Sequence, residues 1–91
     1  MNFNFTLPTT PSNGTGILFY TLNTREGYQG YRIEINGQEG NPISLPSGSH
    51  FATLHTVVEP LRQNNTLQFK SIGAAGASRL EISQVIVFYE D

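Results

Sequence analysis

Apolar and polar residues alternate through most of the chain, and the alternation is clearest in one short segment. Tyr31, Ile33 and Ile35 are separated there by single charged residues. A period of two places the apolar side chains on one face of a β-strand and the charged ones on the other. Asn36-Gly37 follows, and both residue types tolerate the positive φ angles that a tight hairpin turn requires. The pattern predicts a half-buried strand that ends in a hairpin.

Similar patterns predict further strands, each bounded by turn residues. The predicted strands are Asn2–Leu7, Gly16–Leu22, Tyr31–Asn36, Ile43–Leu45, His50–Val58, Thr66–Ile72 and Arg79–Tyr89. No helical period of 3.6 residues extends far enough to predict a helix. Pro42 and Pro46 flank the shortest of these strands. Because proline cannot donate a ladder hydrogen bond, we expect this strand at a sheet edge.

Two predicted strands, Gly16–Leu22 and Arg79–Tyr89, are apolar at both alternating sets of positions. This is typical of strands that are covered on both faces. We therefore expect the last strand in the middle of a sheet, so that the two chain ends are not both at edges. A terminal strand in that place requires a connection that returns across the molecule. The sequence predicts an all-β, antiparallel β-sandwich with seven or eight short strands and jelly-roll or Greek-key connections.

Length and composition narrow the function. The 91 residues predict a single domain, 1–91, and the absence of cysteine removes thiol nucleophiles, thiolate metal sites and disulfides. The net charge is −2 and the five basic residues are scattered, so we expect no nucleic-acid partner. No apolar run reaches the roughly 18 residues of a membrane span.

The N-terminus has no signal-peptide pattern of a basic start and an apolar core. The compartment stays open: the protein is cytosolic, leaves the cell by another route, or is an excised module. The chain is rich in Thr, Ser and Asn, which offer hydrogen bonds with little electrostatic field. Such a surface suits a neutral partner such as a sugar, and equally a soluble β-protein with no such partner.

A binding site is predicted in two loops. Asn23, Arg25 and Tyr28 combine an amide, a guanidinium and an aromatic ring in the loop before the Tyr31 strand, a set that can stack on and orient a sugar ring. Arg79 follows a loop of small residues that would let a ligand approach closely. We expect both loops at one end of the sandwich. The alternative is that they are slack turns, with Tyr28 covering the sandwich end.

Catalytic and metal chemistry find little support. His50 and His55 are five residues apart on one predicted strand, so they point to opposite faces, and no Cys, Asp or third His lies near them in the sequence. The glutamates at positions 34, 39, 59 and 81 show no pairing of the kind that acid–base catalysis uses. We expect a non-catalytic protein without a metal or cofactor.

Four passages of the chain suggest a family. They are Gly16–Leu22, Tyr31–Gly37, Val57–Leu61 with Asn65–Phe69, and Leu80–Val87. They resemble four parts of carbohydrate-binding modules of the family 6 and family 35 type. The first resembles the apolar strand before the central hairpin of these modules, and the second resembles their strand that ends in Asn-Gly. The third resembles their passage of Pro-Leu, a turn and Asn-Thr-Leu, and the fourth resembles their closing strand. The resemblance spans residues 16–89. It implies a galactose-binding-like jelly roll in which a loop at one sandwich end contributes to ligand binding.

The chain departs from this family at two points. The family begins with a further strand pair, for which this chain has room only for Asn2–Leu7. The family's structural calcium site tends to use an acidic residue in the closing strand, where this chain has Ser83, and Asp91 is its only aspartate. A calcium site is therefore not carried over.

Two functions follow as hypotheses. The first is a non-catalytic, lectin-like module that binds a glycan at the loop end, with Tyr28 stacking and Asn23, Arg25 and Arg79 donating hydrogen bonds. The second is a structural or assembly jelly roll that forms trimers or larger oligomers, as capsid-like or complement-head-like proteins do. In either case we expect a homo-oligomer, because a small sandwich has little to cover its edge strands.

Overall fold

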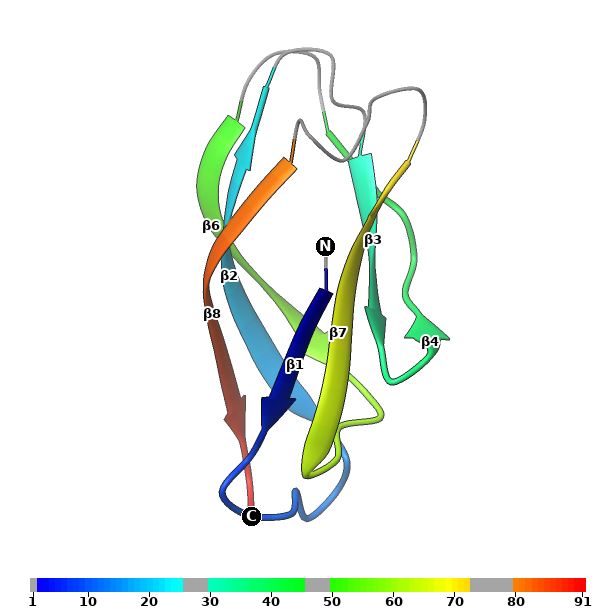
Figure 1. Ribbon diagram of the computed structural model, residues 1–91, viewed down its shortest axis with the longest axis vertical. Helices are drawn as coiled ribbons and strands as arrows, with labels where there is room; N and C mark the ends of the chain where they lie inside the picture. The colour runs from blue at the N-terminus through cyan, green and yellow to red at the C-terminus, as the bar shows by residue number, and fades with distance from the viewer. Residues whose placement is uncertain (1, 26–29, 46–49, 73–79) are drawn as a thin grey trace.

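A computed structural model describes residues 2–25, 30–45, 50–72 and 80–91 of the chain. These residues form strands and connecting segments, with no helix among them. The strands are β1 (Asn2–Thr6), β2 (Gly16–Thr24), β3 (Gly30–Ile35), β4 (Gln38–Glu39), β5 (Ile43–Ser44), β6 (His50–Val58), β7 (Asn64–Ser71) and β8 (Leu80–Tyr89) (Figure 1). The predicted strands are all present, with ends shifted by one or two residues.

The strands build two antiparallel sheets that face each other (Figure 1). One sheet has five strands in the order β1-β7-β3-β4, with β5 also paired to β3, and the other has three in the order β6-β2-β8. The chain crosses between the sheets at every connection except those joining β3, β4 and β5. A meander would pair consecutive strands, so this order has the Greek-key wiring of a jelly roll, and the predicted β-sandwich is confirmed.

The predicted hairpin forms at Asn36 and Gly37, whose φ angles are 51° and 86°. Two positive φ angles match the right-handed twist of the flanking strands, which is why this turn type favours Asn-Gly. The turn pairs Ile35 with Gln38 and so starts β4. The short strand β5 lies at the sheet edge, as Pro42 predicted, and pairs there with the beginning of β3.

The core lies between the sheets and takes one set of alternating residues from each long strand. Its buried apolar residues are Leu7, Leu18, Tyr20, Leu22, Tyr31, Ile33, Ile35, Val58, Leu61, Leu67, Phe69 and Leu80. Tyr20 of β2 and Tyr31 of β3 come from opposite sheets, and their hydroxyl groups hydrogen-bond to each other inside the core. The ring of Phe69 packs against both tyrosines.

The prediction for the last strand is wrong. Among the described strands, β8 pairs with β2 alone and lies at an edge of the three-stranded sheet, and β1 lies at an edge of the other. Both chain ends are therefore at edges. The two apolar faces of β8 have another cause: one packs on the core, and the other lies on the outer surface, where Phe88 is 58% exposed.

A β-bulge at Gln84 also changes which residues of β8 point inward. The register with β2 shifts between Phe19 and Thr21, and Gln84 has a positive φ of 53°. Before the bulge Leu80 and Ile82 pack on the core, and after it Val85, Val87 and Tyr89 do so. One inserted residue exchanges the two faces of a strand, so Ile86 and Phe88 point outward.

Candidate functional site

The outer faces of the two sheets differ in chemistry. The five-stranded sheet carries only polar and charged side chains on its outer face: Asn2, Asn4, Thr6, Arg32, Glu34, Glu39, Asn64, Thr66, Gln68 and Lys70. This is the surface expected where a sheet faces water. The outer face of the three-stranded sheet exposes apolar side chains, which makes this face the candidate site.

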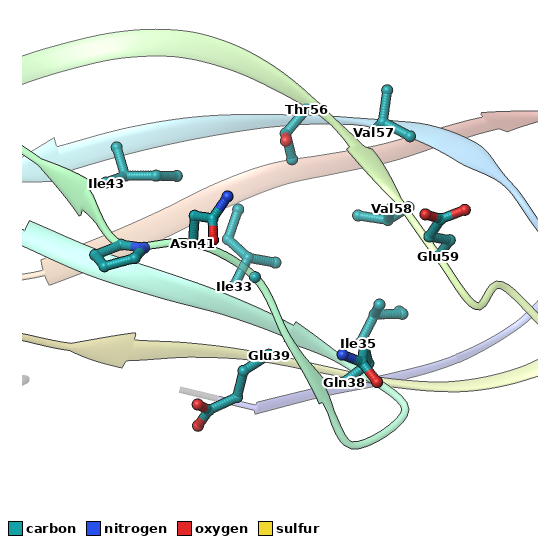
Figure 2. A pocket seen from close by; sticks show the side chains of 12 residues that line it. Ile33, Ile35, Gln38, Glu39, Asn41, Ile43, Thr56, Val57, Val58 and Glu59 are labelled. Carbon is teal, nitrogen blue, oxygen red and sulfur yellow. The ribbon is translucent and has the colours of Figure 1, made fainter.

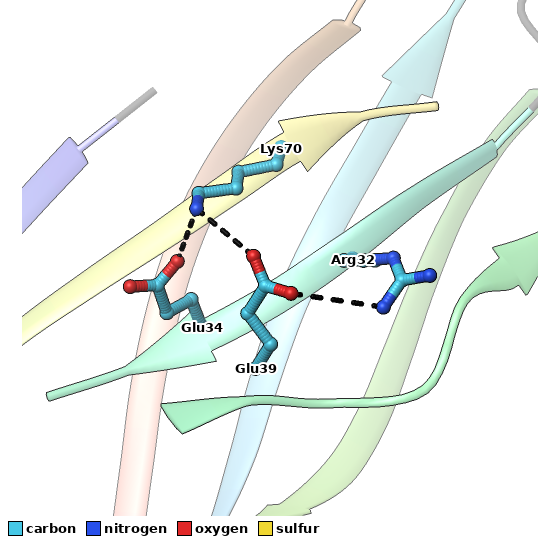
Figure 3. Close-up of polar contacts among 4 residues, drawn as sticks. All are labelled: Arg32, Glu34, Glu39 and Lys70. Atoms are coloured by element: carbon cyan, nitrogen blue, oxygen red, sulfur yellow. Dashed lines mark hydrogen bonds and ion pairs between the residues drawn. The ribbon is translucent and has the colours of Figure 1, made fainter. Parts of the chain in front are cut away.

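An ion network crosses the outer face of the five-stranded sheet (Figure 3). Lys70 Nζ bonds to the carboxylate of Glu34 and lies 3.0 Å from Glu39 Oε1, while Arg32 Nη1 lies 3.7 Å from Glu39 Oε2. The bond to Glu34, followed by that to Glu39, raises the pKa of Lys70, and the bond from Lys70 lowers the pKa of Glu39. The side chains of Arg32, Glu39 and Lys70 are 40–47% exposed and that of Glu34 is 18% exposed, so the network belongs to a partly hydrated surface.

The outer face of the three-stranded sheet carries an apolar patch. We define the apolar patch as Ile17, Phe19, Val57, Ile86 and Phe88. Four members are 42–63% exposed: Ile17 42%, Val57 63%, Ile86 51% and Phe88 58%. Sheet pairing makes the patch continuous, because Ile17 lies opposite both Val57 and Phe88. Contiguous exposed apolar surface of this kind marks an interaction site.

Phe19 occupies the centre of this patch on the middle strand, β2. Its ring meets the ring of Phe88 edge to face at a centroid distance of 5.3 Å and that of His55 at 5.5 Å. Ile86 lies opposite Phe19 on the other side. These contacts fix the aromatic side chains in place before any partner arrives, which lowers the entropy cost of binding.

A polar belt follows along the same face. Thr21 Oγ1 lies 3.2 Å from Thr53 Oγ1 and donates to Gln84 Oε1 at 3.1 Å. These three side chains come from β2, β6 and β8, so the belt crosses the whole sheet. It separates the apolar patch from the end of the sheet where Asn23 and Arg25 lie.

At that end, three side chains form one row across the sheet. Phe51 of β6 is 77% exposed and lies opposite Asn23 of β2, which lies opposite Glu81 of β8. Asn23 Nδ2 donates to Glu81 Oε2 at 3.5 Å. An exposed ring beside an amide and a carboxylate offers both a stacking surface and hydrogen-bonding groups.

The structure places two of the four predicted binding residues. Asn23 lies in this row, and Arg25 is exposed just beyond the end of β2. Tyr28 and Arg79 lie outside the described residues. The strand ends that flank the two predicted loops do meet, since Thr24 pairs with Leu80.

Sequence reasoning missed Phe51 and Glu81 in this row. Their signal was present: each stands at an outward position of a strand and in register with Asn23. Reading it required the strand pairing, because Phe51 and Glu81 are far from Asn23 in the sequence. His50 and His55 lie on opposite faces of β6, as predicted.

A cavity of about 440 Å³ opens between the sheets (Figure 2). Aliphatic side chains line its inner part and polar ones its rim: Ile33, Ile35, Ile43 and Val58 inside, and Gln38, Glu39, Asn41 and Glu59 outside. Its volume is within the range of small-molecule sites. It contains no aromatic ring for stacking on a sugar among its described lining residues.

Within the described residues, no three His, Cys, Asp or Glu side chains come together as a metal site would require. The described part of the chain also contains no helix long and apolar enough to cross a membrane. Comparison with family models, curated proteins and solved structures gives no match. The resemblance to carbohydrate-binding modules therefore stays a prediction.

Proposed function

We propose that the chain is a non-catalytic assembly module, a jelly-roll sandwich whose role is to associate into homo-oligomers. One observation carries this proposal: the outer face of the five-stranded sheet is polar, whereas the outer face of the three-stranded sheet exposes the apolar patch at one end. In a monomeric sandwich both outer faces are in contact with water, so we expect both of them to be polar. Here only the five-stranded sheet meets that expectation.

The position of the patch supports assembly through a protein surface. Its residues lie on three strands, held by the pairing of β2 with β6 and β8, and not on loops. An apolar surface on paired strands can bury its area on a partner without reordering the backbone. This is the requirement of a structural contact.

Sedimentation velocity of the full chain from low to high micromolar concentration tests this function. We expect a sedimentation coefficient that rises with concentration, as association by mass action requires. A single monomeric species at high micromolar concentration would contradict the proposal.

The second candidate is a lectin-like module that binds a glycan at the loop end of the sandwich. The exposed ring of Phe51 beside Asn23 and Glu81 favours it, because sugar rings stack on aromatic faces while amides and carboxylates bind their hydroxyl groups. Arg25, Tyr28 and Arg79 would complete such a site. The absence of tryptophan leaves Phe51 and Tyr28 as the stacking residues.

A glycan array identifies the ligand for this second candidate, and Phe51→Ala then tests the site. We expect the substitution to lower affinity by about ten- to hundredfold, which corresponds to about 1–3 kcal/mol of lost stacking and area. Phe88→Ala is the matched control, since it removes an exposed phenylalanine from the same sheet at the opposite end. Equal losses in the two variants would exclude the loop-end site.

A further inference from the structure

We infer that the apolar patch is covered by a second copy of this chain, stacked face to face so that the assembly closes as a two-fold dimer. This inference rests on the proposed assembly function and adds to it the interface, the partner and the number of copies. It narrows the homo-oligomer expected from the sequence to a dimer, whereas the assembly hypothesis named trimers or larger oligomers.

The near absence of charged side chains on this outer face favours a partner whose contact surface is also uncharged. Among the described residues that point outward from β2, β6 and β8, Glu81 is the one with a formal charge, and it lies at the end away from the patch. If a partner placed charged groups on the apolar patch, those groups would lose their hydration and would find no opposite charge there. The chain itself supplies an uncharged surface of equal size, the apolar patch of another copy.

The size of the face matches a weak but specific dimer. Strands β2 and β6 are nine residues long. Three strands about 4.8 Å apart and about 30 Å long give a footprint of about 430 Å² per copy for the whole outer face, which comprises the apolar patch, the polar belt and the row of Phe51, Asn23 and Glu81. Two copies that cover the whole face bury about 860 Å², which is below the roughly 1,000 Å² that a stable interface exceeds and in the range of weak, transient contacts. We therefore expect a dissociation constant in the micromolar range.

Symmetry limits the assembly to two copies. When a face binds the same face of another copy, both faces are buried in that contact and neither can bind a third copy. Growth beyond the dimer would need a second adhesive surface, and the opposite outer face carries Arg32, Glu34, Glu39 and Lys70 in a hydrated ion network. The edges of β6 and β8 are the competing route, because unpaired strand edges can join two sheets side by side.

Two matched lysine variants separate these routes. Val57→Lys places an ammonium group at the margin of the apolar patch, where Val57 is 63% exposed and contributes little to the fold. By symmetry it adds two like charges to the interface. Thr66→Lys replaces another β-branched, exposed residue, on the outer face of the five-stranded sheet. Thermal melts establish that both variants fold.

Light scattering and sedimentation equilibrium then give mass and affinity. We expect a wild-type dimer, an unchanged dimer for Thr66→Lys, and a dissociation constant at least about 100-fold higher for Val57→Lys. A monomeric wild type would overturn the inference and the assembly function together. If it were monomeric but bound lipid vesicles through the patch, a membrane would be the partner instead.

Other results overturn the inference alone. A wild-type oligomer that Val57→Lys leaves intact would place the contact at a strand edge. A trimer or larger species that Val57→Lys abolishes would show that the patch does not close a dimer.

A distance measurement checks the stacking directly. The chain has no cysteine, so Thr66→Cys accepts a single spin label. A face-to-face dimer separates the two labelled faces by three sheet-to-sheet gaps of about 10 Å, or about 30 Å, plus the label linkers. Electron–electron double resonance should give one distance of that size. A distribution without that distance would contradict face-to-face stacking.

Discussion

We expect Tyr31→Phe to destabilise the sandwich by about 1–3 kcal/mol, although it removes a single oxygen atom. Tyr31 is 0% exposed and Tyr20 is 1% exposed, and the hydrogen bond between their hydroxyl groups joins the two sheets through the core. Without it, the Tyr20 hydroxyl stays buried without that partner. A buried donor without a partner loses the hydration that it has in the unfolded chain and gains nothing in return.

A double-mutant cycle measures the coupling energy between the two hydroxyl groups. Tyr20→Phe should cost a similar amount, because it deprives Tyr31 of the same bond. The double variant should cost less than the sum of the two, since exchanging both partners for apolar groups of the same shape removes both hydroxyl groups of the pair. We expect a coupling energy of about 1–2 kcal/mol, well above the roughly 0.5 kcal/mol scatter of independent sites.

Urea unfolding followed by circular dichroism measures all four proteins. For a domain of this size, each 1 kcal/mol corresponds to about 4–8 °C in melting temperature, so thermal scans give a second reading. Additive single-variant costs would refute the reasoning, because they would mean that the two hydroxyl groups do not depend on each other.

Three further predictions concern pH, the backbone and the predicted binding loop. Burial raises the pKa of Tyr20, and the bond to Tyr31 lowers it by a smaller amount. The contribution of Tyr20 to the free energy of unfolding should therefore be complete below about pH 10, the pKa of tyrosine in the unfolded chain, and should decrease as the pH rises above that value. The urea midpoint of the wild type should fall more steeply over this range than that of Tyr20→Phe. Gly30→Ala should lower the free energy of unfolding in urea by about 1–3 kcal/mol, because Gly30 has a φ of 158° and an added Cβ would collide with the Ile43 carbonyl. An unchanged free energy of unfolding would show that β5 can move away from the added methyl group without cost. Tyr28→Ala should weaken glycan binding without lowering the melting temperature, whereas Tyr31→Ala should cost about 3–5 kcal/mol by opening a core cavity; equal folding defects would make Tyr28 structural.

The sequence by itself determined the local structure of the chain. Alternation at Tyr31, Ile33 and Ile35 placed those side chains in the core, because a strand turns each residue to the face opposite its neighbour. Asn36-Gly37 determined the hairpin, because its positive φ angles suit few other residue pairs. Pro42 marked the edge strand, because it has no amide hydrogen to donate.

The tertiary structure decided how those strands use their faces. The sequence shows that β8 is apolar on both sides, and this predicted a strand covered on both sides. Only the strand order reveals that β8 lies at an edge and that its outer residues, with Ile17 and Val57, form one exposed patch. The bulge at Gln84 was equally hidden, because a one-residue register shift depends on the partner strand.

The candidate site shows the same division. Asn23 stood out in the sequence for its neighbours Arg25 and Tyr28, but Phe51 and Glu81 reach its row only through sheet pairing. Residue order determines which side chains share a face of one strand. Which strands lie beside each other, and whether another layer covers the face that they share, depends on contacts between residues distant in the chain, and these exist only in the folded structure.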